Sequence, residues 1–430
     1  MNFQPFFSEM KAIRQVYKFG GASVKDANGV RKMTRLLKNV QEADLIIVVS
    51  AMAKTTNSLE LLLRLWHAGS EERWKELEIT RSFHQTIVDE LFQKGIEREK
   101  VDSGLKHIWD SISSILRSPP EHYSSDYDRL VSNGELISTQ IISHYLNQEG
   151  LSVQWKDCRE LIVTDSTHRN AKILWEPTQR RMKKAFDAVG WFLTQGFIGA
   201  DLEGRTTTLG REGSDYSAAA ISYALDYDSV TIWKDVPGIK NGDPKVFEDT
   251  ILLNQLSYEE AIELAYYGAS VIHPKTIQPL QRKSIPLYVK SFLHPENPGT
   301  TIGKGLILEP KVDCFIRKEN QWWLRISTRD LAFIAEDQLS TIYLIFYELG
   351  IRINLSTHTA VSSSFCFNGE NQLESLLQER LESHFALSLL KEVSLYTVRH
   401  SNKLSRSKIK GYSRVLHEQS NKDTFQLVVI

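Results

Sequence analysis

Residues 17–23, YKFGGAS, place two glycines at the end of a short β-prone run and directly before a helical pattern, VKDANGVRKMTRLL. A strand that ends in glycines at a helix entrance presents unpaired backbone N–H groups with no side chain in front of them, which suits an anionic phosphate. Lys18 precedes the glycines and can add a positive charge at the same place. A tight turn beside a surface lysine explains the stretch equally simply, so other parts of the chain have to decide between the two.

Short β-prone runs alternate with helical patterns through about the first 300 residues of the 430-residue chain. The runs VYKFGG, DLIIVVS, SVQWKD, SVTIWKDV and PLYVKSF are separated by helical stretches such as SLELLLRLWHAG. This alternation predicts an α/β fold in which a mainly parallel sheet is covered by helices.

A cluster of Pro and Gly in LHPENPGTTIGKG, residues 293–305, predicts the boundary between two domains. We place one domain over residues 1–305 and a smaller one over residues 306–430. The second region has the order strand, helix, two strands, helix, strand, and this βαββαβ order predicts a small α+β domain with an antiparallel sheet. We expect the basic segment SNKLSRSKIKGYSRV, residues 401–415, to be a loop or solvated turn before the last strand.

The composition argues against several classes of protein. The formal net charge is −1, so the total charge gives no indication of a nucleic-acid partner. The stretch LIIVV, residues 45–49, is far shorter than the roughly 20 residues of a membrane-spanning helix. The start MNFQPFFSEMK lacks the pattern of a secretory signal, so we expect a cytoplasmic protein without membrane contact. The three cysteines are far apart, which predicts buried thiols rather than disulfides or a zinc site; they are Cys158, Cys314 and Cys366.

Two further segments bring polar side chains to predicted helix starts. In VVSAMAKTTNSLELLL, residues 48–63, Ser50, Thr55, Thr56 and Asn57 follow a buried strand, and helix capping explains one of these residues but not four. In DRLVSNGELISTQ, residues 128–140, Glu135 falls in a predicted first helical turn, where an acid is also explained by the helix dipole.

The segment FIGADLEGRTTTLGREGSDYSAAAISYAL, residues 197–225, is the most informative of the chain. Small residues allow a ligand to approach the helix start, Arg211 can bind a carboxylate in bidentate fashion, and Asp215 can orient a lysine or a charged ligand. A glycine loop with Asp215 as a helix N-cap is the structural alternative. Downstream, the segment TIWKDVPGIKNGDPKVF (231–247) brings three lysines close to the carboxyl end of a strand, where open α/β sheets bind ligands; they are Lys234, Lys240 and Lys245.

Seven motifs in fixed order resemble the signature set of the aspartokinases, within the amino-acid kinase superfamily. They are KFGGAS, VSAMAKTTN, SNGELIS, TLGREGSDYSAA, WKDVPGI, GDPKV and YGASVIHP. The βαββαβ tail resembles the ACT-type regulatory module of that family. The resemblance implies a three-layer αβα amino-acid kinase fold, a smaller ACT-like domain, and transfer of the γ-phosphoryl group of ATP to the side-chain carboxylate of L-aspartate, the first step of lysine, threonine and methionine biosynthesis.

The resemblance also implies a role for each matched residue. Lys18 would neutralise charge on the transferring phosphoryl group, and Asp215 would organise the lysines. Arg211 and Glu135 would bind the α-carboxylate and α-ammonium of the amino acid, with Ser50, Thr56 and Ser214 nearby. The nucleotide would be held by Phe19, Gly20, Gly21, Ser23, Lys234, Asp235, Lys240 and Lys245, with Mg²⁺ bound mainly through the nucleotide rather than by a dedicated protein site.

The sequence departs from the family pattern at four positions: Ala22, Glu212, Lys234 and Ser270. Lys275 lies five residues after Ser270 and can substitute for the lysine that many members carry there. ACT-type modules imply a homodimer or higher oligomer and an inhibitory effector, lysine or threonine. Candidate effector contacts are Asn354, Ser356, His358 and Thr359, although a polar hairpin explains them as well.

Two other functions stay open from the sequence. A superfamily relative can act on glutamate, acetylglutamate, carbamate or a nucleotide, but Arg211 together with Glu135 suits the two charged ends of a free amino acid. A non-catalytic amino-acid sensor is the second alternative, and the presence of Lys18 and Asp215 argues against it.

Overall fold

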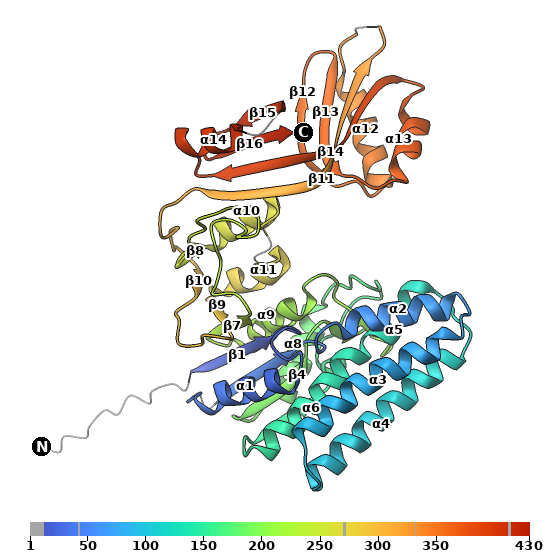
Figure 1. Cartoon of the computed structure of the whole chain (residues 1–430), viewed down its shortest axis with the longest axis vertical. Helices are drawn as coiled ribbons and strands as arrows, with labels where there is room; N and C mark the ends of the chain where they lie inside the picture. Colours follow the sequence, from blue (N-terminus) through green and yellow to red (C-terminus); the bar gives the residue numbers. More distant parts are fainter. Residues whose placement is uncertain (1–12, 42–43, 270–271, 331, 412–413) are drawn as a thin grey trace, which may run out of the picture. The chain divides into compact units, whose positions relative to one another are not determined.

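The computed structural model describes residues 13–41, 44–269, 272–330, 332–411 and 414–430 (Figure 1). Its contacts divide the chain into two compact units. The first unit comprises Met1–Ile239, Leu252–Ile262 and Ile272–Glu309, and the second comprises Lys240–Ile251, Glu263–Val271 and Pro310–Ile430. The predicted domain limits, 1–305 and 306–430, stay predictions. The change of unit at 309/310 lies close to them, whereas no sequence signal indicated the two earlier segments of the second unit.

An eight-stranded sheet forms the centre of the first unit. Its strand order is β3 (Val153–Lys156), β4 (Trp191–Gln195), β2 (Asp44–Val49), β1 (Arg14–Phe19), β7 (Ser229–Lys234), β9 (Leu287–Ser291), β10 (Thr300–Gly303) and β8 (Gln255–Ser257). Neighbouring strands are parallel except β9 and β10. A separate two-stranded ribbon pairs β5 (Ile198–Ala200) with β6 (Thr206–Thr208).

Helices surround this sheet. The helices between β1 and β10 in the chain are α1 (Ala27–Lys38), α2 (Thr55–His67), α3 (Glu72–Leu91), α4 (Ile96–Arg117), α5 (Tyr123–Val131), α6 (Asn133–Gln148), α7 (Cys158–Leu161), α8 (Trp175–Ala185), α9 (Gly213–Leu225), α10 (Tyr258–Tyr267) and α11 (Pro274–Lys283). The helices α1 and α6 share one hydrophobic cluster with β1 and β2, and α9 contacts β1 and β7 and packs against α8 and α11. The mainly parallel, helix-covered sheet confirms the predicted fold class.

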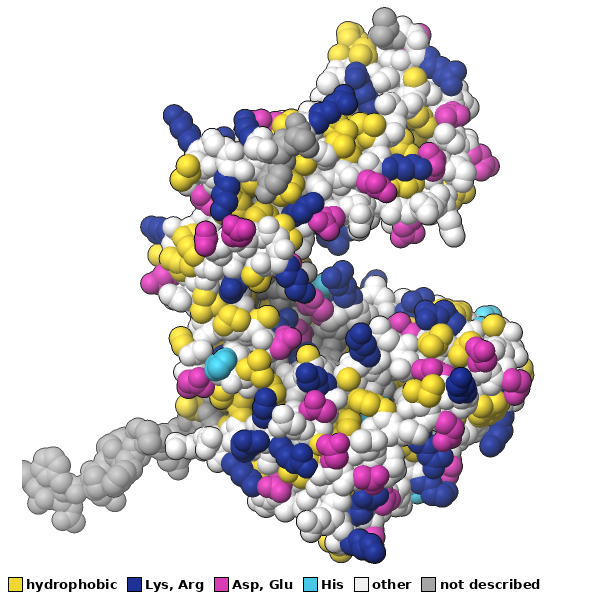
Figure 2. Space-filling model, viewed as in Figure 1, with side chains coloured by type: hydrophobic (Ala, Val, Ile, Leu, Met, Phe, Trp, Pro, Cys, Tyr) yellow, Lys and Arg dark blue, Asp and Glu magenta, His cyan; other side chains and the backbone are white. Residues whose placement is uncertain are grey.

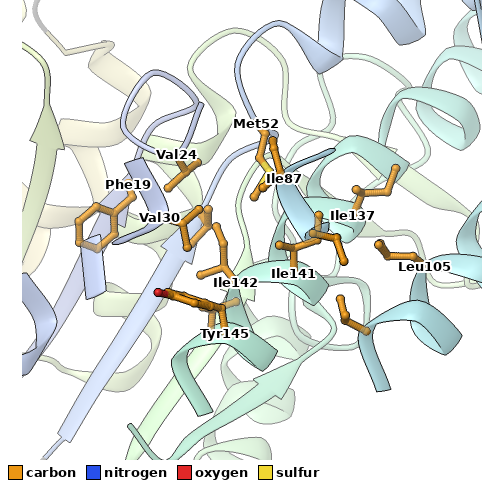
Figure 3. Packing of buried hydrophobic residues seen from close by; sticks show 14 of the residues in the cluster. Phe19, Val24, Val30, Met52, Ile87, Leu105, Ile137, Ile141, Ile142 and Tyr145 are labelled. Atoms are coloured by element: carbon orange, nitrogen blue, oxygen red, sulfur yellow. The ribbon is translucent and has the colours of Figure 1, made fainter. Parts of the chain in front are cut away.

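The alternation of side chains along β1 determines which face of the sheet each side chain reaches. Tyr17 and Phe19 belong to the cluster that α1 and α6 complete with Val30, Met33, Ile137 and other apolar residues. Figure 3 shows Phe19, Val30 and Ile137 of this cluster. Because successive side chains of a strand point to opposite faces, Lys18 points to the face that α9 covers. Lys18, the one charged residue among the four buried positions of β1, is thereby directed to one helix.

The carboxyl ends of four adjacent strands lie level with one another. Register pairs join Phe19 of β1 to Val49 of β2 and to Trp233 of β7, and Val49 to Gln195 of β4. The loops that follow these strands therefore leave the same edge of the sheet, as in other open parallel sheets that bind ligands there.

The second unit contains an antiparallel six-stranded sheet. Its strand order is β12 (Ile353–His358), β13 (Ser362–Asn368), β11 (Cys314–Thr328), β14 (Phe385–Arg399), β16 (Thr424–Val429) and β15 (Val415–Ser420). With α12 (Glu336–Glu348) and α13 (Leu373–Leu381), the chain order from β11 to β14 is the predicted βαββαβ. The helices pack on one apolar cluster that includes Trp322, Phe346 and Phe365.

The prediction of a loop at 401–415 is wrong for most of that segment. Helix α14 spans Lys403–Lys410, and β15 begins at Val415. Asn402 starts the helix with a capping box, because its side chain accepts from Leu404 N and Ser405 N while Ser405 Oγ accepts from Asn402 N. We expected a loop because the segment is polar and basic, and the capping residues at its start were not recognised.

Other predictions concern the cysteines, membrane-spanning helices and surface charge. The thiols of Cys158, Cys314 and Cys366 are buried, as predicted. Among the described residues, no helix combines the length and apolar character that crossing a bilayer requires. On the face seen in Figure 2, Lys and Arg side chains alternate with Asp and Glu, in keeping with the near-zero net charge.

Gly196, directly after β4, allows the first turn of α9 to approach the sheet edge. A Cβ at position 196 would lie 2.4 Å from Ser214 Cβ and 2.7 Å from Ser214 Cα. Real Cβ atoms do not come this close to a backbone atom, so any side chain at this position displaces the helix start.

We therefore predict that Gly196→Ala lowers the free energy of unfolding by about 1–3 kcal/mol, the usual cost of overpacking. Gly190→Ala is the control, because the nearest atom to its added Cβ is 4.0 Å away, on the Phe192 ring. Chemical denaturation of both variants checks this. Equal stability of the two variants would contradict the close approach of Ser214.

Candidate active site

A cavity of about 590 Å³ lies at the carboxyl edge of the large sheet, within the first unit. Its lining collects most of the predicted site residues from five separate segments of sequence. The predicted residues that line it are Lys18, Gly20, Gly21, Ser23, Ser50, Thr56, Glu135, Arg211, Ser214, Asp215, Lys234 and Asp235. The roles expected for these residues stay predictions.

A buried carboxylate joins two lysines in the cavity. Asp215, in the first turn of α9, lies 2.6 Å from Lys18 Nζ and 3.7 Å from Lys234 Nζ. Burial opposes the charged form of Asp215, but the two ammonium groups outweigh it and hold the pKa of the carboxyl below its ordinary value. Asp215 is not the N-cap of α9, since Glu212 holds that position. The orienting role is thus the one that the geometry favours.

The glycine stretch after β1 forms a compact turn beside these lysines. Ser23 N donates to Gly20 O at 2.9 Å, and Ala53 N donates to Gly21 O at 3.1 Å. A Cβ on Gly20 would lie 3.4 Å from Lys18 Nζ and would occupy the space in front of that ammonium. The absence of a side chain at position 20 keeps the ammonium accessible from the cavity.

Three residues expected at the nucleotide do not line the cavity. The ring of Phe19 stacks on Trp233 within the core, with 6.2 Å between ring centroids. Lys240 and Lys245 belong to Lys240–Ile251, a segment of the second unit. There, Lys240 Nζ donates to Thr250 Oγ1 at 3.2 Å, and Lys245 is exposed. Their roles in nucleotide binding stay predictions.

Glu135 is a buried acid with one unused oxygen. Its Oε1 accepts from Ala51 N at 3.3 Å, whereas its Oε2 is buried without a hydrogen-bond partner among the described residues. Burial raises the pKa of Glu135 to about 8, although the Ala51 amide and the charge of Lys18 favour the ionised form. Placement in the first turn of α6 does not account for so costly a burial.

The departures at Ala22 and Glu212 both face the cavity. Glu212 has φ 54° and ψ 28°, a left-handed conformation that costs a non-glycine residue energy. Its Oε2 accepts from His273 N at 2.9 Å and so connects the loop before α9 to the residue before α11. Ser270 lies outside the described residues, and Lys275 Nζ contacts Asn170 Oδ1.

The cavity also contains residues that sequence reasoning missed. They are Tyr127, Arg169, Phe197 and Trp233. Phe197 and Arg169 have positive φ values, 68° and 64°, which no sequence pattern indicated. Trp233 precedes the predicted Lys234, but its buried Nε1 lacks a hydrogen-bond partner among the described residues, a feature that only the structure reveals.

A second hollow of about 710 Å³ in the first unit contains none of the predicted site residues. Arg159, which lines it, is held by Asp157, and Lys184 falls in the last turn of α8, where a cation suits the helix dipole. Within the described ranges, no group of three or more His, Cys, Asp or Glu side chains is arranged to hold a metal ion.

Comparison with known proteins identifies the family. Residues 14–291 match the model of the amino acid kinase family. The chain is 32% identical over 354 residues to lysine-sensitive aspartokinase 3 of Escherichia coli, covering 81% of this chain and 76% of that protein. It is 28% identical to bifunctional aspartokinase/homoserine dehydrogenase 2 of Arabidopsis thaliana, a chloroplastic protein of which it spans only 42%.

A solved structure gives the same result for the whole fold. The crystal structure of E. coli aspartokinase III in complex with aspartate and ADP has a TM-score of 0.82 to this chain at 26% identity. The match covers 97% of this chain and 96% of that one. The chain therefore belongs to the amino acid kinase family and, within it, to the aspartokinases.

Proposed function

We propose that this chain transfers the γ-phosphoryl group of ATP to the side-chain carboxylate of L-aspartate, giving 4-phospho-L-aspartate. The observation that carries the proposal is the shared cavity of Asp215, Lys18 and Lys234 with Glu135 and Arg211. Two ammonium groups held on one buried carboxylate suit the phosphate side of a kinase. An acid and a guanidinium in the same cavity suit the two charged ends of an amino acid.

In this proposal, the phosphates of the nucleotide bind at Lys18, Lys234 and the glycine turn. The open space in front of Lys18 Nζ, which a Cβ at Gly20 would fill, accommodates phosphate oxygens. Asp215 holds both lysines at the cavity through its ion pairs with them. Mg²⁺ would enter with ATP and would neutralise part of the phosphate charge.

In this proposal, the amino-acid substrate binds at Glu135 and Arg211. The unused Oε2 of Glu135 requires a donor, and the α-ammonium of a free amino acid supplies one. Arg211 is exposed in the cavity, and its side chain has no hydrogen bond or ion pair to the residues that the structure describes. Its planar guanidinium can therefore donate hydrogen bonds to a carboxylate of the substrate.

Transfer in this arrangement requires positioning and electrostatic stabilisation rather than a covalent intermediate. Glu135 and Arg211 hold the amino acid so that its side-chain carboxylate faces Lys18. Lys18 stabilises the negative charge that develops on the phosphoryl oxygens, and Asp215 fixes the direction of its ammonium.

The alternatives fit the cavity less well. An N-acetylated amino acid has no ammonium for the buried Glu135, which disfavours an acetylglutamate kinase. A non-catalytic amino-acid sensor does not require the ion pair that Lys18 and Asp215 form at 2.6 Å. Free glutamate differs from aspartate by one methylene, and only competition kinetics distinguishes the two.

The second unit supports a regulatory proposal. We propose that it binds lysine or threonine, and that the chain forms a homodimer or higher oligomer through this unit in the cytoplasm. In support, the similar E. coli aspartokinase 3 is named lysine-sensitive. Of the candidate contacts, Asn354 donates to Gln321, and His358 and Thr359 contact Ser363 and Ser362. Adding each amino acid to the kinase assay tests this proposal.

Formation of aspartyl phosphate tests the main proposal. The chain is incubated with ATP, Mg²⁺ and L-aspartate in the presence of hydroxylamine, which traps an acyl phosphate as a hydroxamate. We expect hydroxamate to form, and Lys18→Met to lower kcat by on the order of 10²–10³. Turnover with acetylglutamate but not aspartate, or full activity of Lys18→Met, would contradict the proposal.

The raised pKa of Glu135 predicts a pH dependence. Aspartate requires the ionised acid, so kcat/KM for aspartate should rise with pH up to about 8. Between the ordinary value of 4.5 and about 8, the folded chain binds the Glu135 proton that the unfolded chain has lost. Through this group, the free energy of unfolding of the ligand-free chain therefore falls as pH rises over that range.

The variant Glu135→Gln should remove both dependences and lower kcat/KM for aspartate about 10- to 100-fold, with Glu78→Gln on the surface of α3 as control. Steady-state kinetics and thermal unfolding from pH 5 to 9 provide the measurement. An unchanged pH profile in Glu135→Gln would show that another group is responsible.

A further inference from the structure

Arg169 brings a second guanidinium into the substrate cavity, and neither a motif nor the family resemblance assigned it a role. It lines the same cavity as Arg211, Glu135 and Thr56. Its guanidinium lies 4.7 Å from the ring centroid of Tyr127 and 5.7 Å from that of Tyr123. Among the described residues, its side chain has no carboxylate partner and no hydrogen bond. An arginine held by aromatic faces keeps the edge of its planar fork available for a ligand.

The loop that carries Arg169 is fixed by a buried acid. Asp128 is fully buried and accepts from Arg169 N at 3.1 Å, from His168 Nδ1 at 2.8 Å and from Thr208 Oγ1 at 2.6 Å. Arg169 itself has a φ of 64°, a conformation that a non-glycine residue keeps only where its surroundings enforce it. Tyr127 is fixed as well, because its hydroxyl donates to Glu60 Oε1 at 2.9 Å. The guanidinium is therefore preorganised.

The loops of the two arginines are in direct backbone contact. A Cβ at Gly210, the residue before Arg211, would lie 3.0 Å from the Arg169 carbonyl oxygen. Both arginines thus line the cavity from neighbouring loops.

We propose that Arg169 and Arg211 together bind the α-carboxylate of the amino-acid substrate, an inference that rests on the proposed aspartate kinase function. The side-chain carboxylate has to face Lys18 to receive the phosphoryl group, and Glu135 is the buried acceptor for the ammonium. The α-carboxylate is the remaining charged group, and the two guanidinium groups without carboxylate partners match it. Arg169 then determines specificity for substrates that carry a second carboxylate.

The test compares Arg169→Met and Arg169→Lys with Arg180→Met, a control on the exposed surface of α8 where Arg180 contacts Glu176. Kinetics with L-aspartate and ATP are combined with competitive inhibition by succinate and by β-alanine. Succinate keeps both carboxylates of aspartate, whereas β-alanine keeps the ammonium and the reacting carboxylate but lacks the α-carboxylate. Thermal unfolding verifies that each variant is folded.

We expect Arg169→Met to raise the KM for aspartate and the inhibition constant of succinate about 10- to 100-fold, and to leave the KM for ATP and the inhibition constant of β-alanine unchanged. Arg169→Lys should recover part of the loss, because it keeps the charge without the planar fork. The inference is wrong if Arg169→Met leaves the KM for aspartate unchanged. It is also wrong if this variant raises the inhibition constant of β-alanine as much as that of succinate. Absence of turnover in the unmodified chain would instead reject the proposed function.

Discussion

The site depends on one buried ion pair, between Lys18 on β1 and Asp215 on α9. Both side chains are almost fully buried, and a buried charge is stable only when it is paired. The pair explains why a lysine can occupy the middle strands of a parallel sheet. It also ties the first strand of the chain to a helix that begins almost two hundred residues later.

Three features of the fold bring this pair to the ligand cavity. Strand alternation turns Lys18 toward α9 and Phe19 toward the core. The level carboxyl ends of β1, β2, β4 and β7 bring the loops of the site to one edge. Gly196 then lets the first turn of α9 come close to that edge, so that Asp215 reaches Lys18. Each feature is a packing requirement, and together they position the chemistry.

The sequence predicted the fold class well, since hydrophobic alternation reports directly on buried strands and covering helices. It also indicated the site residues that lie in glycine-rich or hydroxyl-rich loops after strands, such as Ser50, Arg211 and Asp215. It failed where position depends on tertiary contacts. Arg169 enters the cavity only because Asp128 holds its loop, and nothing near Arg169 in the sequence announces that contact. Lys240 and Lys245 follow the strand end closely in sequence, yet their segment packs with the second unit.

The central claim is that Asp215 acts in catalysis by holding Lys18 rather than through an independent effect. A double-mutant cycle on kcat tests this most directly, with Lys18→Met, Asp215→Asn and the variant that combines them. If the carboxylate acts through the ammonium, the loss in the double variant is far smaller than the product of the two single losses. A double variant whose kcat falls by the full product would contradict the account.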